Sequence, residues 1–181
     1  VLSTPFYTIG HSPRSIPEFV DLLRAGQVEM VIDIRTIPRS RTNPQYNADT
    51  LPDLLGQRQI GHCRIEELGG LRGKSPGIDP GINGWWTNRS FHNYADYALS
   101  GAFLSGIEQL EALGRSRRVA VMCSEAVWWR CHRRFIADYL LDRGHDVFHL
   151  MGVGRMDAAS MTPSARRQKD GHLVYPADNQ A

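Results

Sequence analysis

The sequence has few cysteines and no long hydrophobic run. Its three cysteines among 181 residues are odd in number and too sparse for a disulfide framework, which favours a reducing compartment. No stretch approaches the roughly 18 consecutive apolar residues that a membrane-spanning helix requires. Residues 1–10 also lack the basic region and apolar stretch of a signal peptide. We therefore expect a cytoplasmic protein without a membrane partner.

The chain also lacks a strong excess of charge and is poor in lysine. The formal net charge is +2, which excludes a protein that attracts polyanions over its whole surface. Of the 21 basic residues, only Lys74 and Lys169 are lysine. Arginine favours planar, bidentate contacts with phosphate and carboxylate groups, so the excess of arginine fits anion recognition. A GC-rich genome that favours arginine codons explains it equally well.

Short hydrophobic runs alternate with amphipathic helical patterns along the chain. The runs predict strands over residues 6–10, 30–34, 62–66, 118–122 and 146–151. The helical patterns cover residues 15–26, 50–59, 91–99, 103–113 and 132–143. This alternation predicts a three-layer α/β sandwich with a mostly parallel central sheet, in which the first two strands form a parallel pair. We expect a single domain over residues 1–181, with its core at about 6–151 and a polar, incompletely ordered tail at about 152–181.

The carboxyl ends of the predicted strands carry most of the unusual polar residues. These residues fall in four segments, 10–12, 35–41, 66–70 and 123–133. In an open parallel sheet, ligands bind outside the carboxyl ends of the strands. We therefore expect a single functional site at this edge of the sheet. Asp33 lies inside a predicted strand and requires a partner when buried, and Arg35 is the nearest candidate.

Cys123 follows a predicted buried strand and precedes a predicted helix. At such a position, backbone N–H groups and the helix dipole favour a thiolate, and Arg130, Arg133 and Arg134 add positive charge. A thiol with a lowered pKa is what a nucleophilic or redox-active cysteine needs. The alternative is a buried cysteine at a strand end that behaves as a small hydrophobic residue.

Several other polar residues are candidates for roles around Cys123. His11 or His132 could act as the acid or base, and Glu125 could orient or deprotonate a reacting group. For His11, a histidine that merely caps the following helix is an equally good interpretation. We expect the contacts to an anionic substrate to come from Ser12, Arg35, Arg39, Ser40, Asn47, Arg130, Arg133 and Tyr94. For Tyr94, packing in the core is the competing interpretation. The sequence predicts no cofactor.

Cys123, Cys131 and His132, with His11 as a fourth member, also form a possible set of metal ligands. The familiar zinc modules, however, contain a C-x2-C pair or an H-x3-H pair, and the chain has neither. A reversible disulfide between Cys123 and Cys131 is a further alternative, because the two residues flank one short loop. We predict no bound metal.

The four tryptophans form two adjacent pairs, Trp85–Trp86 and Trp128–Trp129, in predicted loops. Exposed tryptophan beside arginine suggests stacking on nucleic-acid bases. Tryptophan that fills the edge of the core or an oligomer interface accounts for the same pattern.

Together these motifs resemble an uncharacterised family, the domain of unknown function 488. The matching pieces are residues 8–12, 33–35, 38–40, 43–44 with Asn47, 67–70, 94–97, 122–125 and 130–133. The resemblance spans about residues 6–151 and implies a fold and a site, but no established reaction. The chain has Ser124 where the family often has alanine, and residues 127–129 are bulkier than usual, so this wall of the site is expected to differ.

A weaker likeness is to rhodanese and cysteine-dependent phosphatase domains. In those domains too, a strand leads into a cysteine loop and then a helix. The phosphatases use a C-x5-R spacing, whereas Cys123 to Arg130 is C-x6-R. The likeness therefore concerns architecture and does not extend to the reaction.

Three hypotheses about function follow. The first is an enzyme with a cysteine-containing site for an anionic or nucleotide-like substrate. The second is a nucleic-acid-binding or regulatory module without catalysis, whose affinity for oligonucleotides would fall as salt rises. The third is a metal-binding or redox-sensing protein that works through Cys123 and Cys131. Convergence of His11, Arg35, Glu125 and Cys123 in one cleft would favour the first.

Overall fold

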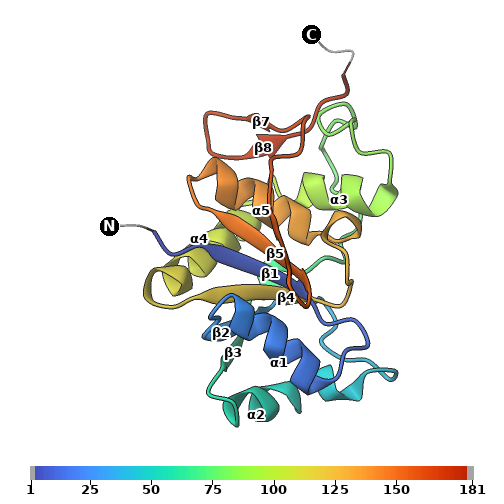
Figure 1. Cartoon of the computed structure of the whole chain (residues 1–181). Helices are drawn as coiled ribbons and strands as arrows, with labels where there is room; N and C mark the ends of the chain where they lie inside the picture. The colour runs from blue at the N-terminus through green and yellow to red at the C-terminus, as the bar shows by residue number, and fades with distance from the viewer. Residues whose placement is uncertain (1–2, 179–181) are drawn as a thin grey trace.

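A six-stranded sheet forms the middle layer of the protein (Figure 1), and the computed structural model describes residues 3–178. The strand order is β3-β2-β4-β1-β5-β6, with β6 as the only antiparallel member. The strands are β1 (Phe6–Gly10), β2 (Met30–Asp33), β3 (Gly61–Arg64), β4 (Val119–Cys123), β5 (Val147–Gly152) and β6 (Arg155–Ala158). The prediction of a mostly parallel central sheet in a single α/β domain is confirmed.

Helices cover both faces of this sheet, which completes the three layers. Helices α1 (Ile16–Ala25) and α2 (Leu51–Gly56) lie on one face. On the other face lie α3 (Arg89–Tyr97), α4 (Gly101–Ser116) and α5 (Arg133–Asp142). Each face has its own hydrophobic core, because successive strand residues point to opposite sides of the sheet.

Alternation along β4 shows how these two cores are divided. Val121 and Cys123 pack with α3, α4 and α5, whereas Ala120 and Met122 pack with α1 and α2. Every residue of this strand is buried, as expected of a strand that is covered on both faces. The side chain of Cys123 therefore points to the face of the sheet that α5 covers.

The order of the strands differs from the predicted pairing of the first two. Strands β1 and β2 are parallel, but β4 lies between them and pairs with both. A hydrophobic pattern indicates which residues are buried but carries no information on which strand is the neighbour. The insertion of β4 matters for function because it places Cys123 between the ends of β1 and β2.

Local capping explains where two of the helices begin. The Ser15 hydroxyl accepts a hydrogen bond from the Glu18 amide at 3.3 Å and starts α1. The Ser100 hydroxyl accepts from the Phe103 amide at 3.2 Å and starts α4, which confirms the predicted break before this helix. Helix α2 is shorter than predicted and ends at Gly56.

The C-terminal segment is more ordered than the sequence predicts. After β6, the strands β7 (Arg166–Arg167) and β8 (Leu173–Val174) form a small antiparallel ribbon. Leu173 and Tyr175 are fully buried, and the Tyr175 hydroxyl donates to Asp138 Oδ2 at 2.9 Å. The hydrophobic core therefore extends beyond residue 151. Isolated apolar residues in a polar segment form no periodic pattern, so their burial could not be recognised from the sequence.

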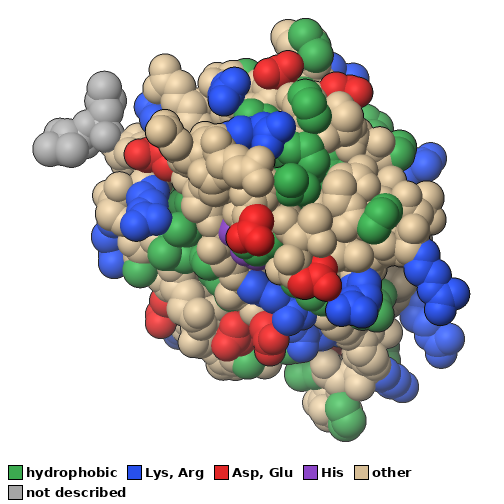
Figure 2. Space-filling model, turned by 90° about the horizontal axis from the view of Figure 1, so that it is seen from below, with side chains coloured by type: hydrophobic (Ala, Val, Ile, Leu, Met, Phe, Trp, Pro, Cys, Tyr) green, Lys and Arg blue, Asp and Glu red, His purple; other side chains and the backbone are tan. Residues whose placement is uncertain are grey.

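The surface carries no single dominant charge on the face drawn in Figure 2. Acidic and basic side chains are interspersed there with hydrophobic ones. Across residues 3–178, no helix combines the length and apolar character that crossing a membrane requires.

Candidate functional site

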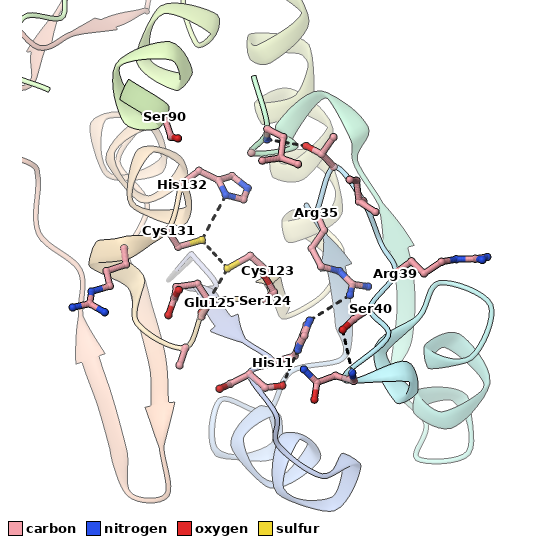
Figure 3. A pocket seen from close by; sticks show the side chains of 18 of the residues that line it. His11, Arg35, Arg39, Ser40, Ser90, Cys123, Ser124, Glu125, Cys131 and His132 are labelled. Carbon is pink, nitrogen blue, oxygen red and sulfur yellow. Dashed lines mark hydrogen bonds between the residues drawn. The ribbon is translucent and has the colours of Figure 1, made fainter. Parts of the chain in front are cut away.

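A cavity of about 660 Å³ opens at the carboxyl ends of β1, β2 and β4. The loops that follow these three strands form most of its wall, together with Gly70, Leu71 and the first residues of α3. Figure 3 shows His11, Arg35, Cys123, Cys131 and His132 around this cavity. Residues from all four strand-end segments therefore line one cavity.

The loop after β4 lies directly against the end of β1. The amide of His11 donates to the Cys123 carbonyl at 2.9 Å, and the amide of Ser12 donates to the Ser124 carbonyl at 3.0 Å. A Cβ atom at Gly10 would overlap the carbonyl oxygen of Glu125. Only glycine allows this approach, which holds the cysteine loop beside His11.

The two cysteines of this loop form a close pair in the cavity wall. The Sγ atoms of Cys123 and Cys131 are 2.6 Å apart, and the residues are 3% and 5% exposed. Both residues line the cavity, so a small molecule inside it can reach them. The third cysteine, Cys63, lies in β3 and does not belong to the pair.

The surroundings of the pair distinguish the two sulfur atoms. Burial raises the pKa of both thiols. For Cys131 this effect is outweighed by the hydrogen bond from Cys123 and by the charges of His132 and Arg133, so the pKa of its thiol lies well below the ordinary value. For Cys123, burial and the neighbouring sulfur hold the pKa of the thiol well above that value. These surroundings favour Cys131 over Cys123 as the thiolate of the pair.

The backbone at the start of α5 contributes to this polarity. The Arg133 amide donates to Cys131 Sγ at 3.4 Å, so the sulfur caps the first turn of the helix. The partial positive charge at a helix N-terminus favours an anion at this position. The sequence singled out Cys123 at this strand–helix junction, whereas the helix amide contacts Cys131.

The backbone carbonyl of Ile34, the residue that follows β2, holds His132 against Cys131. His132 Nε2 lies 3.0 Å from the Ile34 oxygen and donates to it, which directs Nδ1 towards Cys131 Sγ at 3.5 Å. The ring also packs on Tyr94, with centroids 5.1 Å apart. Gly70 lies so close that an added Cβ would be 2.5 Å from Nδ1. The imidazole therefore has one well-defined position beside the thiolate.

His11 has both ring nitrogens engaged by the protein. Nδ1 donates to the Ser12 carbonyl at 2.8 Å, and Nε2 accepts from Arg35 Nη1 at 3.3 Å. The ring stacks on Tyr46 with centroids 4.2 Å apart. Burial lowers the pKa of His11, and the Arg35 charge adds to this. This neutral imidazole supports Arg35, and in this arrangement neither nitrogen is free to exchange a proton with a bound molecule.

Arg35 is the buried partner of Asp33 that the sequence led us to expect. Its Nε donates to Asp33 Oδ1 at 2.9 Å, and Nη2 donates to Oδ2 at 2.7 Å and to the Tyr46 carbonyl at 2.6 Å. Nη1 donates to His11 and has a second hydrogen. Because Arg35 also lines the cavity, this second N–H is available to donate a hydrogen bond to a bound anion.

The other residues predicted to belong to the site lie at different depths. Ser12, Ser40, Tyr94, Arg39, Glu125 and Arg130 line the cavity. The Arg39 side chain is 74% exposed, lies 3.9 Å from Asp49, and points away from the sulfur pair in Figure 3. Glu125 and Arg130 are exposed at the mouth.

Asn47 and Arg133 do not line the cavity, contrary to their predicted contact roles. Asn47 Oδ1 accepts from the Ser40 amide at 2.7 Å and shapes the loop. Arg133 is fully buried, and its Nη2 donates to the carbonyls of Glu125 at 2.7 Å and Ala126 at 3.3 Å. An arginine in an amphipathic helix appears solvent-exposed in sequence, and its carbonyl acceptors come from another element. Both residues therefore build the site without touching a ligand.

A family comparison complements this geometry. The model of the domain of unknown function DUF488 matches residues 15–140. The chain belongs to the DUF488 family. No curated protein and no solved structure matches the chain. The region that matches the DUF488 model includes Arg35, both cysteines of the pair and His132, whereas His11 lies just before it.

The DUF488 site also contains residues that the sequence did not single out. Thr36, Ile37, Leu71, Ser90 and Phe91 line the cavity. Leu71 and Ile37 are 67% and 62% exposed, so they form an apolar rim at its mouth. Thr36, Ile37 and Leu71 lie in irregular segments, and Ser90 and Phe91 lie at the start of α3. No periodic pattern marks these residues as part of a cavity wall.

The tryptophans of the DUF488 chain mostly serve packing. Trp86 is buried and lies 4.7 Å from the ring of Phe135. Trp128 stacks on His149 at 4.8 Å, with ring planes 8° apart. Trp129 is the more exposed member of its pair, at 41%. Among residues 3–178, no group of three or more His, Cys, Asp or Glu side chains is arranged to hold a metal ion.

Proposed function

We propose that this DUF488 protein is an enzyme that uses a cysteine thiolate on an anionic or nucleotide-like small molecule. The observation that carries the proposal is the cavity in which Cys131, paired with Cys123, adjoins His132. A nucleophile beside a base that a third group orients is the usual arrangement for covalent catalysis. Here the third group is the Ile34 carbonyl.

Each member of the thiol site has a distinct proposed role. Cys131 attacks an electrophilic atom of the substrate, because its thiol has the lowered pKa. Cys123 donates a hydrogen bond to the thiolate and holds it in place. His132 Nδ1, 3.5 Å from Cys131 Sγ, is placed to exchange a proton with Cys131 and with a leaving group.

Two features of the cavity support an anionic substrate. Its volume of about 660 Å³ lies within the range of small-molecule and cofactor sites. Arg39 and Arg130 at the mouth, with one N–H of Arg35 deeper inside, can donate to phosphate or carboxylate oxygens. The exposed Ile37 and Leu71 would cover an apolar portion such as a base. Glu125 adds one negative charge at the same mouth and would disfavour a highly charged ligand.

Ligand binding is tested first, with the reduced protein. Nucleoside monophosphates, sugar phosphates and the matching uncharged nucleosides are titrated while the melting temperature is followed. We expect the charged compounds to raise it, and we expect Arg130→Gln to weaken their binding about tenfold or more, because charge-assisted hydrogen bonds contribute about 1.5–3 kcal/mol. Arg155→Gln, on the distant edge strand β6, serves as the matched control and should bind as the wild type does.

Turnover is tested next, under reducing conditions. Each compound that binds is incubated with wild type, Cys131→Ala and Cys123→Ala, and the products are followed by mass spectrometry. We expect turnover by the wild type and its loss in Cys131→Ala. Equal turnover by wild type and Cys131→Ala would refute the proposal. Salt-sensitive binding of a single-stranded oligonucleotide without turnover of any compound would instead support the non-catalytic nucleic-acid role.

A further inference from the structure

The Cys123–Cys131 pair is also arranged for a reaction that the proposed catalysis does not require. Its two sulfur atoms are 2.6 Å apart, and a disulfide bond is about 2.05 Å long, so bond formation requires a shift of only about 0.5 Å. Catalysis by Cys131 alone would need a hydrogen-bond donor but not a second thiol. The presence of a thiol at this position therefore calls for a separate explanation.

We infer that Cys131 is a site of reversible oxidation by peroxides and that Cys123 is its resolving cysteine. The inference rests on the proposed function in one respect, because it uses the same Cys131 thiolate. It adds a class of co-reactant, hydrogen peroxide or a small organic hydroperoxide, and a modified state of the site. Both cysteines line the open cavity, which gives a small peroxide a route to them.

The geometry assigns the order of the two steps. Cys131 receives the Arg133 amide at 3.4 Å and adjoins His132, so it is the sulfur held as an anion. The thiolate attacks one peroxide oxygen, the O–O bond breaks, and Cys131 becomes a sulfenic acid while hydroxide leaves. Cys123 sulfur then attacks Cys131 sulfur. The S–S bond forms, the S–O bond breaks, and the departing hydroxide takes the thiol proton as water.

Hydrogen peroxide is the only oxidant that the net change requires. The Cys131 thiolate, the Cys123 thiol, one hydrogen peroxide and one proton from solvent give one protein disulfide and two waters. Reduction by an external dithiol reverses the change and restores the thiolate. The oxidised pair has no thiolate, so the enzyme proposed above would be inactive until it is reduced, and Cys131 would be protected from further oxidation to the sulfinic acid.

Peptide mapping of the full, folded chain tests this inference. The reduced protein is treated with an equimolar amount of hydrogen peroxide, and its free thiols are then alkylated and mapped. Of the three thiols, we expect the wild type to lose two to a Cys123–Cys131 disulfide and to recover both with a dithiol. Cys63→Ser is the matched control and should form the same disulfide, because Cys63 lies in β3 outside the pair.

Two variants test the assignment of roles. Cys123→Ser should accumulate a sulfenic acid at Cys131 that dimedone traps, because the resolving thiol is missing. Cys131→Ser should leave Cys123 unmodified under the same conditions. Three free thiols retained by the folded wild type after peroxide treatment, or a disulfide that contains Cys63, would overturn the inference.

These outcomes are independent of the turnover test above. The turnover test is carried out in reductant, where the cysteine pair is reduced in every protein tested. Absence of turnover there refutes the proposed enzyme, and peroxide oxidation is still judged separately by thiol mapping. Retained thiols after peroxide treatment refute the oxidation and leave turnover in reductant unaffected.

Discussion

His132 is one of the side chains whose position affects the thiol of Cys131. Three neighbours define that position: the Ile34 carbonyl at 3.0 Å, the Tyr94 ring, and Gly70, which has no side chain to displace the imidazole. If His132 moved away, Cys131 would lose a neighbouring charge that lowers its pKa. Gly70 therefore affects the Cys131 thiol indirectly, because its lack of a side chain leaves room for the His132 ring.

Substituting Gly70 by alanine should disturb the thiolate while the fold is retained. The added Cβ would lie 2.5 Å from His132 Nδ1, so the ring must move. We expect the apparent pKa of Cys131 to rise and any turnover to fall about tenfold or more, because acid–base partners contribute factors of about 10² to 10⁴. The ultraviolet absorbance of the thiolate as a function of pH measures the first effect directly.

Gly73→Ala provides the matched control for this substitution. Nothing lies within 4 Å of a Cβ at Gly73, which belongs to the same irregular segment. It should behave as the wild type does in both measurements. An unchanged thiolate titration in Gly70→Ala would show that the position of His132 does not affect Cys131.

Helix α5 and the loop after β4 act as one structural unit because Arg133 joins them. The guanidinium is fully buried and donates to the carbonyls of Glu125 and Ala126. Its Nη1 also lies 3.4 Å from the Thr8 hydroxyl of β1. The Arg133 side chain thus connects the cysteine loop both to helix α5 and to strand β1.

Arg133→Met should destabilise the protein and loosen the cysteine loop. It removes the buried guanidinium that donates to the carbonyls of Glu125 and Ala126, and the loss of such hydrogen bonds costs about 1–3 kcal/mol of the free energy of unfolding. Denaturant unfolding followed by circular dichroism measures the change. Arg155→Met removes an exposed arginine that pairs with Asp157, and it should change the stability by less than about 0.5 kcal/mol. Equal stabilities of the two variants would contradict this role for Arg133.

The sequence predicts the elements of this fold better than it predicts their order. The runs that end at Gly10 and Cys123 are short, apolar and followed by polar residues, which identifies them as buried strands with a site at their ends. The insertion of β4 between β1 and β2 depends on how the two helical layers pack, and local patterns do not encode it.

For the candidate site, the sequence singled out most of the polar residues that line the cavity but not their bonding. The Asp33–Arg35 pair could be foreseen, because a buried carboxylate needs a nearby cation. The engagement of both His11 nitrogens and the burial of Arg133 could not, because their partners include Arg35, Glu125 and other groups of distant elements. Which cysteine is the thiolate likewise depends on three-dimensional contacts around the start of α5.

The whole molecule is joined across the sheet and the C-terminal segment by buried polar contacts. Asp138 of α5 accepts from the Thr162 amide and from the Tyr175 hydroxyl, both at 2.9 Å, so the segment after β6 is anchored to helix α5. Thr8 of β1 and His149 of β5 are joined side chain to side chain at 2.6 Å. Protonation of such buried groups affects the stability of the entire fold.

Stability should therefore decrease with acidification over the pH range in which the protonation of His149 differs between the folded and the unfolded chain. Burial, aided by the Arg133 charge, lowers the pKa of His149 from its ordinary 6.5 to about 4. Above pH 6.5 both states are neutral and the stability is fully present. Between pH 6.5 and 4 the unfolded chain takes up a proton that the folded chain does not, so the free energy of unfolding falls by about 1–3 kcal/mol.

Denaturant unfolding at a series of pH values measures this dependence. His11 and His62, whose pKa values are also lowered by burial, contribute in the same direction. His149→Asn removes one titrating group, so its stability should fall less steeply over this range than that of the wild type. An identical slope in the variant would mean that His149 protonates equally well in the folded protein.

The pH dependence of cysteine alkylation in the reduced, folded protein is the most direct test of the thiol site. Iodoacetamide is added over a range of pH, and the rates at Cys123, Cys131 and Cys63 are separated by peptide mass spectrometry. We expect Cys131 to react first, with a midpoint below the ordinary thiol pKa of about 8.5. A midpoint for Cys131 at or above that value, or faster reaction at Cys123, would contradict a site built around the Cys131 thiolate.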